Sequence, residues 1–177
     1  MLEIKINKII NSQDCFSCHT PCCRFLLKDK YFAPIATDIE TNNIYKKTGT
    51  RINFKQFKKN KNIFQVRLKK SKKTNIYLCP FLNEETNECQ VYDCRPLDCA
   101  LWPFILVKKN REIFLSRMRK KLCPSLKKIS NKKFLNYMEY LKSKKMINEL
   151  RNLIKKYPGL AWEWEKDFIC LYKLHLD

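Results

Sequence analysis

The chain has 177 residues, a formal net charge of +20 and ten cysteines, but only two histidines and two glycines. A domain of this length buries a sufficient core without covalent staples, so the cysteines are not needed to hold a small fold together. Glycine occurs only at Gly49 and Gly159, which excludes a P-loop or a glycine-rich dinucleotide fingerprint, because both need several glycines.

The amino-terminal segment "MLEIKINKII" has charges at Glu3, Lys5 and Lys8 and does not resemble a secretory signal. No window approaches the roughly 18 consecutive apolar residues of a membrane-spanning helix. We therefore expect a cytoplasmic protein that does not enter a membrane. In that reducing compartment, clustered cysteines are metal ligands or redox thiols more often than structural disulfides.

The stretch "DCFSCHTPCC" at 14–23 contains Cys15, Cys18, Cys22 and Cys23. The C-x-x-C spacing of the first two lets both sulfurs reach one metal atom or one edge of a cluster. Neighbouring side chains point in different directions, so the adjacent pair suits a cluster of several iron atoms, or two metal sites, better than one small tetrahedral ion.

Local patterns predict a capped helix next. Thr37 followed by Glu40 forms a capping-box pattern, and Gly49 suits the end of a helix over 37–49. The alternation in "NIFQVRLKK", followed by "NIYLCPFL", predicts a hairpin over 62–79. This hairpin would deliver Cys79 at the end of a strand.

A second hairpin is predicted in "FILVKKNREIFLSRM", with its turn at Lys109 and Asn110. From Ser130 the apolar residues recur at helical spacing, until the proline and glycine at 158–159 end the run. The segment "LAWEWEKDFICLYKL" at 160–174 predicts a final helix, in which Cys170 is a buried thiol without a metal role.

These elements predict an α+β fold, with a small antiparallel sheet of hairpins around a cysteine-rich metal site and with C-terminal helices. We expect a single domain over 1–177. Within it, 15–124 would form the cysteine-cluster core and 130–177 a helical C-terminal part.

The positive charge is distributed in blocks. Residues 41–83 contain 12 basic residues and no acidic one, and 113–138 also contain basic residues but no acidic one. The segment 84–98 between them contains five acidic residues and one basic residue, Arg95. Such blocks suit an anionic partner such as RNA. Lysine greatly outnumbers arginine, however, whereas planar phosphate recognition would favour arginine. Nucleic acid is therefore considered as a partner but not favoured over a solvated, lysine-rich surface.

A second group of cysteines lies at Cys79, Cys89, Cys94, Cys99 and Cys123, in the contexts "CPFL", "CQVYDCRPLDC" and "CPSL". Thiolates are soft ligands that suit zinc or iron–sulfur clusters. An arginine among them, Arg95, would offset their negative charge and donate hydrogen bonds to sulfur. The alternative is that Arg95 only forms the turn before the next proline.

The blocks "CFSCHTPCC", "CPFL", "CQVYDCRPLDCALWPF" and the "CP" at 123–124 together resemble the YkgJ-type cysteine-cluster proteins, a zinc- or iron-chelating family. The resemblance includes the pattern C-x-[IV]-Y-x-x-R-P-x-x-C at 89–99. It implies that the metal or cofactor is bound by Cys15, Cys18, Cys22, Cys23, Cys79, Cys89, Cys99 and Cys123. Cys94 and His19 fall at positions that the family leaves variable and rank below these eight.

Three functions follow as hypotheses. The first is a metalloprotein with a [4Fe-4S]-type iron–sulfur cluster, in a redox or accessory role in the modification of an unknown protein partner or substrate. The cysteine pattern is similar to that of bacterial flagellin lysine methylases. This resemblance implies such a cluster. The second is a structural-zinc module that binds RNA or another polyanion. The third is a thiol redox or metal-delivery protein, although the expected thioredoxin context is missing. No substrate or methyl-donor motif is identified, so enzymatic activity and catalytic residues stay open.

Overall fold

The computed structural model describes the chain except for residues 1–3, 5, 19–21, 59, 120–122 and 177. It divides into two compact units, one formed by Ser12–Ala100 and the other by Met1–Asn11 together with Leu101–Asp177. Helices and small antiparallel sheets occur together, which confirms the α+β class. That the whole chain folds as a single domain stays a prediction.

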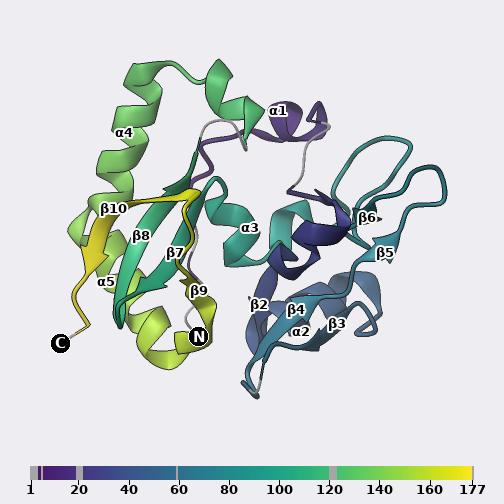
Figure 1. Ribbon diagram of the computed structural model, residues 1–177, viewed down its shortest axis with the longest axis horizontal. Coiled ribbons are helices and arrows are strands. Elements are labelled where there is room, and N and C mark those ends of the chain that lie inside the picture. The colour runs from purple at the N-terminus through teal and green to yellow at the C-terminus, as the bar shows by residue number, and fades with distance from the viewer. Residues whose placement is uncertain (1–3, 5, 19–21, 59, 120–122, 177) are drawn as a thin grey trace. The chain divides into compact units, whose positions relative to one another are not determined.

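The unit Ser12–Ala100 contains two three-stranded antiparallel sheets, with strand orders β1-β6-β5 and β2-β4-β3 (Figure 1). Its elements in chain order are α1 (Ser12–Phe16), β1 (Arg24–Phe25), η1 (Leu27–Phe32), β2 (Ile35–Thr37), α2 (Asp38–Thr48), β3 (Phe54–Gln56), β4 (Ile63–Val66), β5 (Lys69–Lys70), β6 (Tyr77–Leu78), η2 (Tyr92–Cys94) and α3 (Leu97–Leu101).

Helix α2 confirms the helix predicted over 37–49. The Thr37 hydroxyl accepts a hydrogen bond from the Glu40 amide at 3.2 Å, and the Glu40 carboxylate accepts one from the Thr37 amide at 2.7 Å. Gly49 ends the helix with a φ of 71°, in the left-handed region that favours glycine. Glu40 also accepts a hydrogen bond from the Leu97 amide at 2.6 Å, so one carboxylate joins the starts of α2 and α3.

The hairpin predicted over 62–79 is confirmed in part: β5 and β6 form an antiparallel hairpin across 71–76, but β4 does not take part in it. Strand β4 is the centre of its own sheet, between β2 and β3, while β6 pairs with β5 and β1. The alternation in "NIFQVRLKK" identified β4 as a strand, but periodicity does not specify the partner of a strand. Cys79 does follow a strand, because β6 ends at the preceding residue.

An apolar cluster forms the core between these elements, and the cysteines take part in it. Its buried members are Ala36, Ile44, Phe54, Val66, Leu78, Cys79, Phe81, Leu82 and Val91. Cys23, Cys89 and Cys94 are partly buried and pack against this cluster. The cysteine-rich region therefore lies on the core of the unit and is shielded from water on that side.

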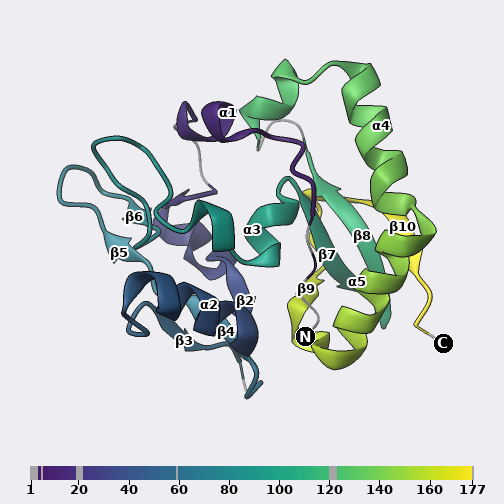
Figure 2. The ribbon, with the colours of Figure 1, turned by 180° about the vertical axis from the view of Figure 1, so that it is seen from behind.

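The second unit contains a four-stranded sheet with the order β10-β8-β7-β9. Its elements are β7 (Phe104–Lys109), β8 (Glu112–Met118), η4 (Pro124–Lys128), α4 (Asn131–Lys142), α5 (Lys144–Lys156), η5 (Pro158–Leu160), β9 (Trp162–Glu163) and β10 (Phe168–Leu174). Helices α4 and α5 cover one face of the sheet (Figures 1 and 2). Phe104 of β7 contacts Phe134 and Tyr137 of α4, with ring centroids 5.9 and 5.4 Å apart.

The hairpin of β7 and β8 confirms the second predicted hairpin, with the turn one residue later than expected. Asn110 and Arg111 occupy the turn, with φ values of 51° and 67°. Positive φ at both positions is typical of the type I′ turn, whose twist matches that of the strands. Within the described residues, no helix combines the length and the apolar character needed to cross a bilayer.

The helical run after Ser130 is confirmed but consists of two helices, because Ser143 ends α4 and caps α5. The helix predicted over 160–174 is wrong. This segment instead forms β9 and β10, and β10 pairs with β8 along its length. As a consequence, Cys170 is only half-buried, opposite Ser116 on the neighbouring strand.

We predict that Glu40→Ala destabilises the protein more than Thr37→Ala. Loss of the Thr37 cap costs about 1 kcal/mol. Loss of Glu40 leaves the Thr37 and Leu97 amides without their acceptor, at about 1–3 kcal/mol for each group that stays buried. Urea unfolding measures both effects, with the exposed Lys46→Ala as the control. Equal losses for Glu40→Ala and Thr37→Ala would contradict the shared role of this carboxylate.

Candidate metal centre

The short pairing of β1 with β6 brings the two distant cysteine groups together. Cys22 and Cys23 immediately precede β1, and Cys79 immediately follows β6. In the antiparallel register, Arg24 lies opposite Leu78, which places Cys23 opposite Cys79. The Cys79 amide donates a hydrogen bond to the Cys23 carbonyl at 2.9 Å. The backbone therefore fixes the first contact between the groups.

The C-x-x-C segment is held against the second group by Asn87. Cys15 lies in α1, and the Cys18 amide donates to the Cys15 carbonyl at 3.1 Å, which closes a turn. The Asn87 side-chain amide donates to the Cys18 carbonyl at 3.0 Å and also to the Phe16 carbonyl. Asn87 has a φ of 60°, a conformation that asparagine tolerates better than most residues. Sequence analysis missed Asn87, although its place two residues before Cys89 was a usable signal.

The segment with Cys89 and Cys99 is held at both ends, by a β-bridge at Cys89 and by a side-chain hydrogen bond next to Cys99. Cys89 forms a β-bridge with Leu82, whose amide donates to the Cys79 carbonyl at 3.0 Å. Cys99 lies in α3, and the Asp98 carboxylate at the start of that helix accepts a hydrogen bond from the Ile35 amide at 3.1 Å. Three separate segments of the unit thus deliver cysteines to one region.

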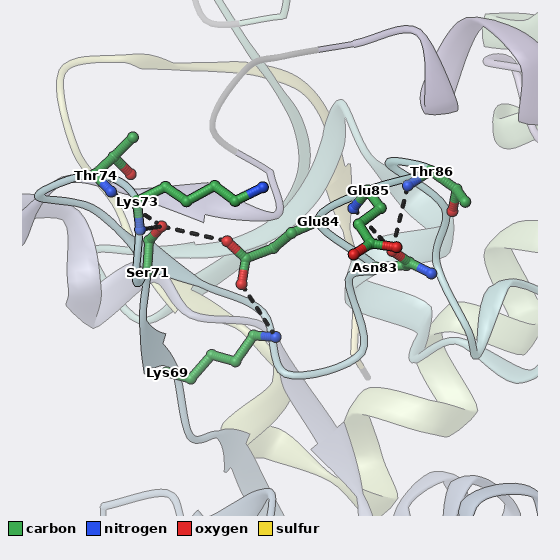
Figure 3. A network of polar contacts seen from close by, with 8 residues as sticks. All are labelled: Lys69, Ser71, Lys73, Thr74, Asn83, Glu84, Glu85 and Thr86. Atoms are coloured by element: carbon green, nitrogen blue, oxygen red, sulfur yellow. Dashed lines mark hydrogen bonds and ion pairs between the residues drawn. The ribbon is translucent and has the colours of Figure 1, made fainter.

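A polar network fastens the turn between Cys79 and Cys89 (Figure 3). Glu84 forms an ion pair with Lys69 at 3.5 Å and accepts a hydrogen bond from the Ser71 hydroxyl at 3.3 Å. Asn83 accepts hydrogen bonds from the Glu85 and Thr86 amides at 2.8 and 3.2 Å. Glu84 therefore holds this turn against β5 and the residues that follow it.

Seven thiols interact electrostatically within this unit. They are Cys15, Cys18, Cys22, Cys23, Cys79, Cys89 and Cys99. Burial raises the pKa of Cys79 to about 12, and it also raises the pKa of Cys99 well above its usual value. A thiolate in such a place is costly, because each ionised sulfur is desolvated and repels its neighbours.

The side chains of the adjacent pair, Cys22 and Cys23, were expected to point apart, but their sulfurs are in contact. The Cys22 thiol donates a hydrogen bond to the Cys23 sulfur, which raises the pKa of Cys22 well above its usual value. The same contact lowers the pKa of Cys23, but burial and the nearby thiols raise it overall. The pair lies before the regular pairing of β1 begins, so strict alternation of side chains does not apply to it.

The donor set fits a thiolate-bound metal or cluster. Soft sulfur donors are what zinc and iron–sulfur centres use. A buried polar atom supports this fit, because the Nε of Arg95, next to these thiols, has no hydrogen-bond partner among the described residues. Within that same part of the chain, no three His, Cys, Asp or Glu side chains converge closely enough to hold an ion. The protonated thiols are thus neighbours without forming a closed site, and bound metal would draw them together.

The structure describes three further cysteines, Cys94, Cys123 and Cys170. Cys94 interacts with Lys47 and Asp93. Cys123 is buried in the other unit, just before η4, and Cys170 belongs to β10. His19 lies outside the described residues. Metal binding by the eight predicted cysteines stays a prediction.

A comparison with protein families matches residues 14–139 to the CxxCxxCC model, described as a "putative zinc- or iron-chelating domain". With thiols as its donors, the chain belongs to the class of cysteine-rich metal-binding proteins. The match spans most of the chain, so the chain belongs to the CxxCxxCC family, as the resemblance of its cysteine blocks implied. No curated protein and no solved structure matches the chain.

We predict that metal affinity rises with pH between about pH 6 and 8. Thiols whose pKa is raised are protonated in this range, and metal must displace those protons to bind thiolate. An ion held by four thiols releases about four protons, and the logarithm of the affinity rises with pH with that slope. Zinc titrations against a chromophoric chelator measure it. An affinity that does not change with pH would contradict metal binding by these thiols.

Proposed function

We propose that this protein binds an iron–sulfur cluster of the [4Fe-4S] type through its cysteines. The observation that carries the proposal is that seven thiols from three segments act on one another electrostatically. Four of them suffice for a cluster, and the others leave donors for a second thiolate site beside it. A cluster has several iron atoms, and it can accept sulfurs such as those of Cys22 and Cys23, which lie side by side.

A redox or accessory role in a modification reaction suits such a cluster. The apolar core next to Cys79, Cys23 and Cys89 limits access of water to the sulfurs, and solvent exposure is one determinant of a cluster's reduction potential. The partner or substrate would be another protein, as the first hypothesis holds. Cytoplasmic location belongs to the same proposal, since a reducing compartment preserves the thiols.

A structural-zinc module is the second candidate, and a basic surface on α2 and the following loop favours it. Arg51 stacks on the exposed Tyr45 at 4.7 Å, Lys58 lies 5.3 Å from the centre of the Phe57 ring, and Ile52 is 77% exposed. Basic side chains beside aromatic rings are one way in which proteins contact single-stranded nucleic acid. Zinc would then supply folding free energy while this surface contacts RNA or another polyanion.

Anaerobic purification should give a brown protein with comparable amounts of iron and acid-labile sulfide. Charge transfer from sulfur to iron produces the visible absorption, which zinc lacks. Metal analysis, sulfide analysis and the visible spectrum are measured on the same sample. A colourless protein with stoichiometric zinc and no sulfide would overturn the cluster and favour the zinc module.

Cysteine variants provide the control for this experiment. Cys18→Ser and Cys99→Ser should each lose bound metal, because one comes from the C-x-x-C turn and the other from α3. Cys170→Ser should keep it, since this half-buried residue of β10 is not among the eight cysteines that the family pattern marks as ligands. Equal metal loss in all three variants would show that the division between ligand and non-ligand cysteines is wrong.

If the basic surface contacts RNA, binding of a single-stranded RNA oligonucleotide weakens steeply as salt rises. The slope of log affinity against log salt is about −0.7 for each phosphate contact. Lys55→Glu combined with Lys58→Glu should reduce both affinity and slope. Lys144→Glu combined with Lys145→Glu, at the start of α5, makes the same change of charge elsewhere and is the matched control. Equal loss in both double variants would point to net charge alone.

A further inference from the structure

Arg95 occupies a fixed position among the clustered thiols. It directly follows η2 in extended conformation, and its guanidinium lies over the Tyr92 ring, 4.5 Å from the ring centre. Tyr92 in turn contacts the Phe16 ring edge-to-face, with centroids 5.1 Å apart. Phe16 is the neighbour of Cys15 in α1. Two aromatic rings thus connect the arginine to the C-x-x-C segment.

The guanidinium acts on more of the thiols than any other cation that the structure describes near them. It donates a hydrogen bond to Cys15, and its charge also acts on Cys22, Cys89 and Cys99. Lys69, by comparison, acts on Cys79, and Lys47 acts on Cys94. Arg95 therefore acts on cysteines of the N-terminal segment and of the segment that contains Cys89 and Cys99.

The second observation concerns the Nε atom of Arg95. It is buried and has no hydrogen-bond acceptor among the described residues. A buried donor without a partner costs about 1–3 kcal/mol, and more when the group is charged. A guanidinium does not avoid this cost by losing its proton. A thiolate sulfur that bound metal draws toward Nε would remove this cost.

We propose that Arg95 is the counter-charge of the metal centre. It donates one hydrogen bond to Cys15 and, through Nε, a second to another sulfur of the loaded centre. A divalent ion with four thiolates carries a net charge of about −2, and a reduced cluster is more negative still. In a partly buried site, one fixed cation offsets this charge and stabilises the reduced form.

This inference rests on the proposed function, because it requires thiolate-bound metal at these cysteines. It differs from the simpler interpretation, in which Arg95 only shapes the turn before Pro96. Replacing a residue that only shapes a turn would change the stability of the fold. Replacing a counter-charge would change the affinity for metal and the reduction potential of the cluster.

Arg95→Gln and Arg95→Lys, compared with the wild type, separate these roles. Gln keeps a polar side chain without charge, and Lys keeps the charge without the planar fork. Arg51→Gln is the matched control, because Arg51 also stacks on a tyrosine, at 4.7 Å, and donates to Asn42 at 2.8 Å. Each variant is assayed for zinc affinity by chelator competition and, after anaerobic reconstitution with iron and sulfide, for reduction potential. Urea unfolding of the metal-free proteins monitors the fold.

Arg95→Gln should weaken zinc binding about tenfold to a hundredfold, the usual effect of removing a group that contacts metal ligands. It should also shift the potential of the cluster to more negative values, and Arg95→Lys should restore part of both losses. Arg51→Gln should leave both unchanged. Wild-type affinity and potential in Arg95→Gln, or a loss of metal-free stability without a change in either, would overturn the proposal while leaving metal binding intact. A wild type that binds neither metal would instead overturn the proposed function, and the role of Arg95 with it.

Discussion

The candidate metal centre depends on the pairing of two very short strands. Only two residue pairs join β1 to β6, yet this ladder places Cys22 and Cys23 beside Cys79 across more than fifty residues of chain. Closing a loop of that length costs conformational entropy that two backbone pairs do not offset by themselves. The apolar cluster under Leu78 and Cys79 supplies the rest, because burial of its side chains requires the same approach of the two strands.

That apolar support also determines the electrostatics of the centre. Thiols next to a core are desolvated, so they hold their protons at neutral pH and do not form a ring of repelling thiolates. Metal changes the balance, because bonds to the ion replace the protons. Arg95 offsets the negative charge of the thiolates that metal binding creates. Its guanidinium does not lose its charge and is held in place by Tyr92.

The sequence predicted those parts of the structure that local chemistry decides. The box of Thr37 and Glu40, the stop at Gly49 and the turn near Asn110 each depend on residues a few positions apart, and all were found. The failures were non-local. Spaced apolar residues suggested a helix over 160–174, where pairing with β8 imposes a strand, and the aromatic and β-branched run "FICLY" was the neglected signal. No local pattern could have revealed β1, or that Cys15 provides the sulfur to which Arg95 donates.

The hydrogen bond from the Cys79 amide to the Cys23 carbonyl has a consequence for the order of events during synthesis. The C-x-x-C segment leaves the ribosome before its partners, because the residues of β2, α2, β3 and β4 lie between them in the chain. During that interval the early cysteines have no apolar core beside them and remain open to water. The full set of predicted ligands is therefore available only after Cys123 has emerged, so binding of metal by all of them would be a late step.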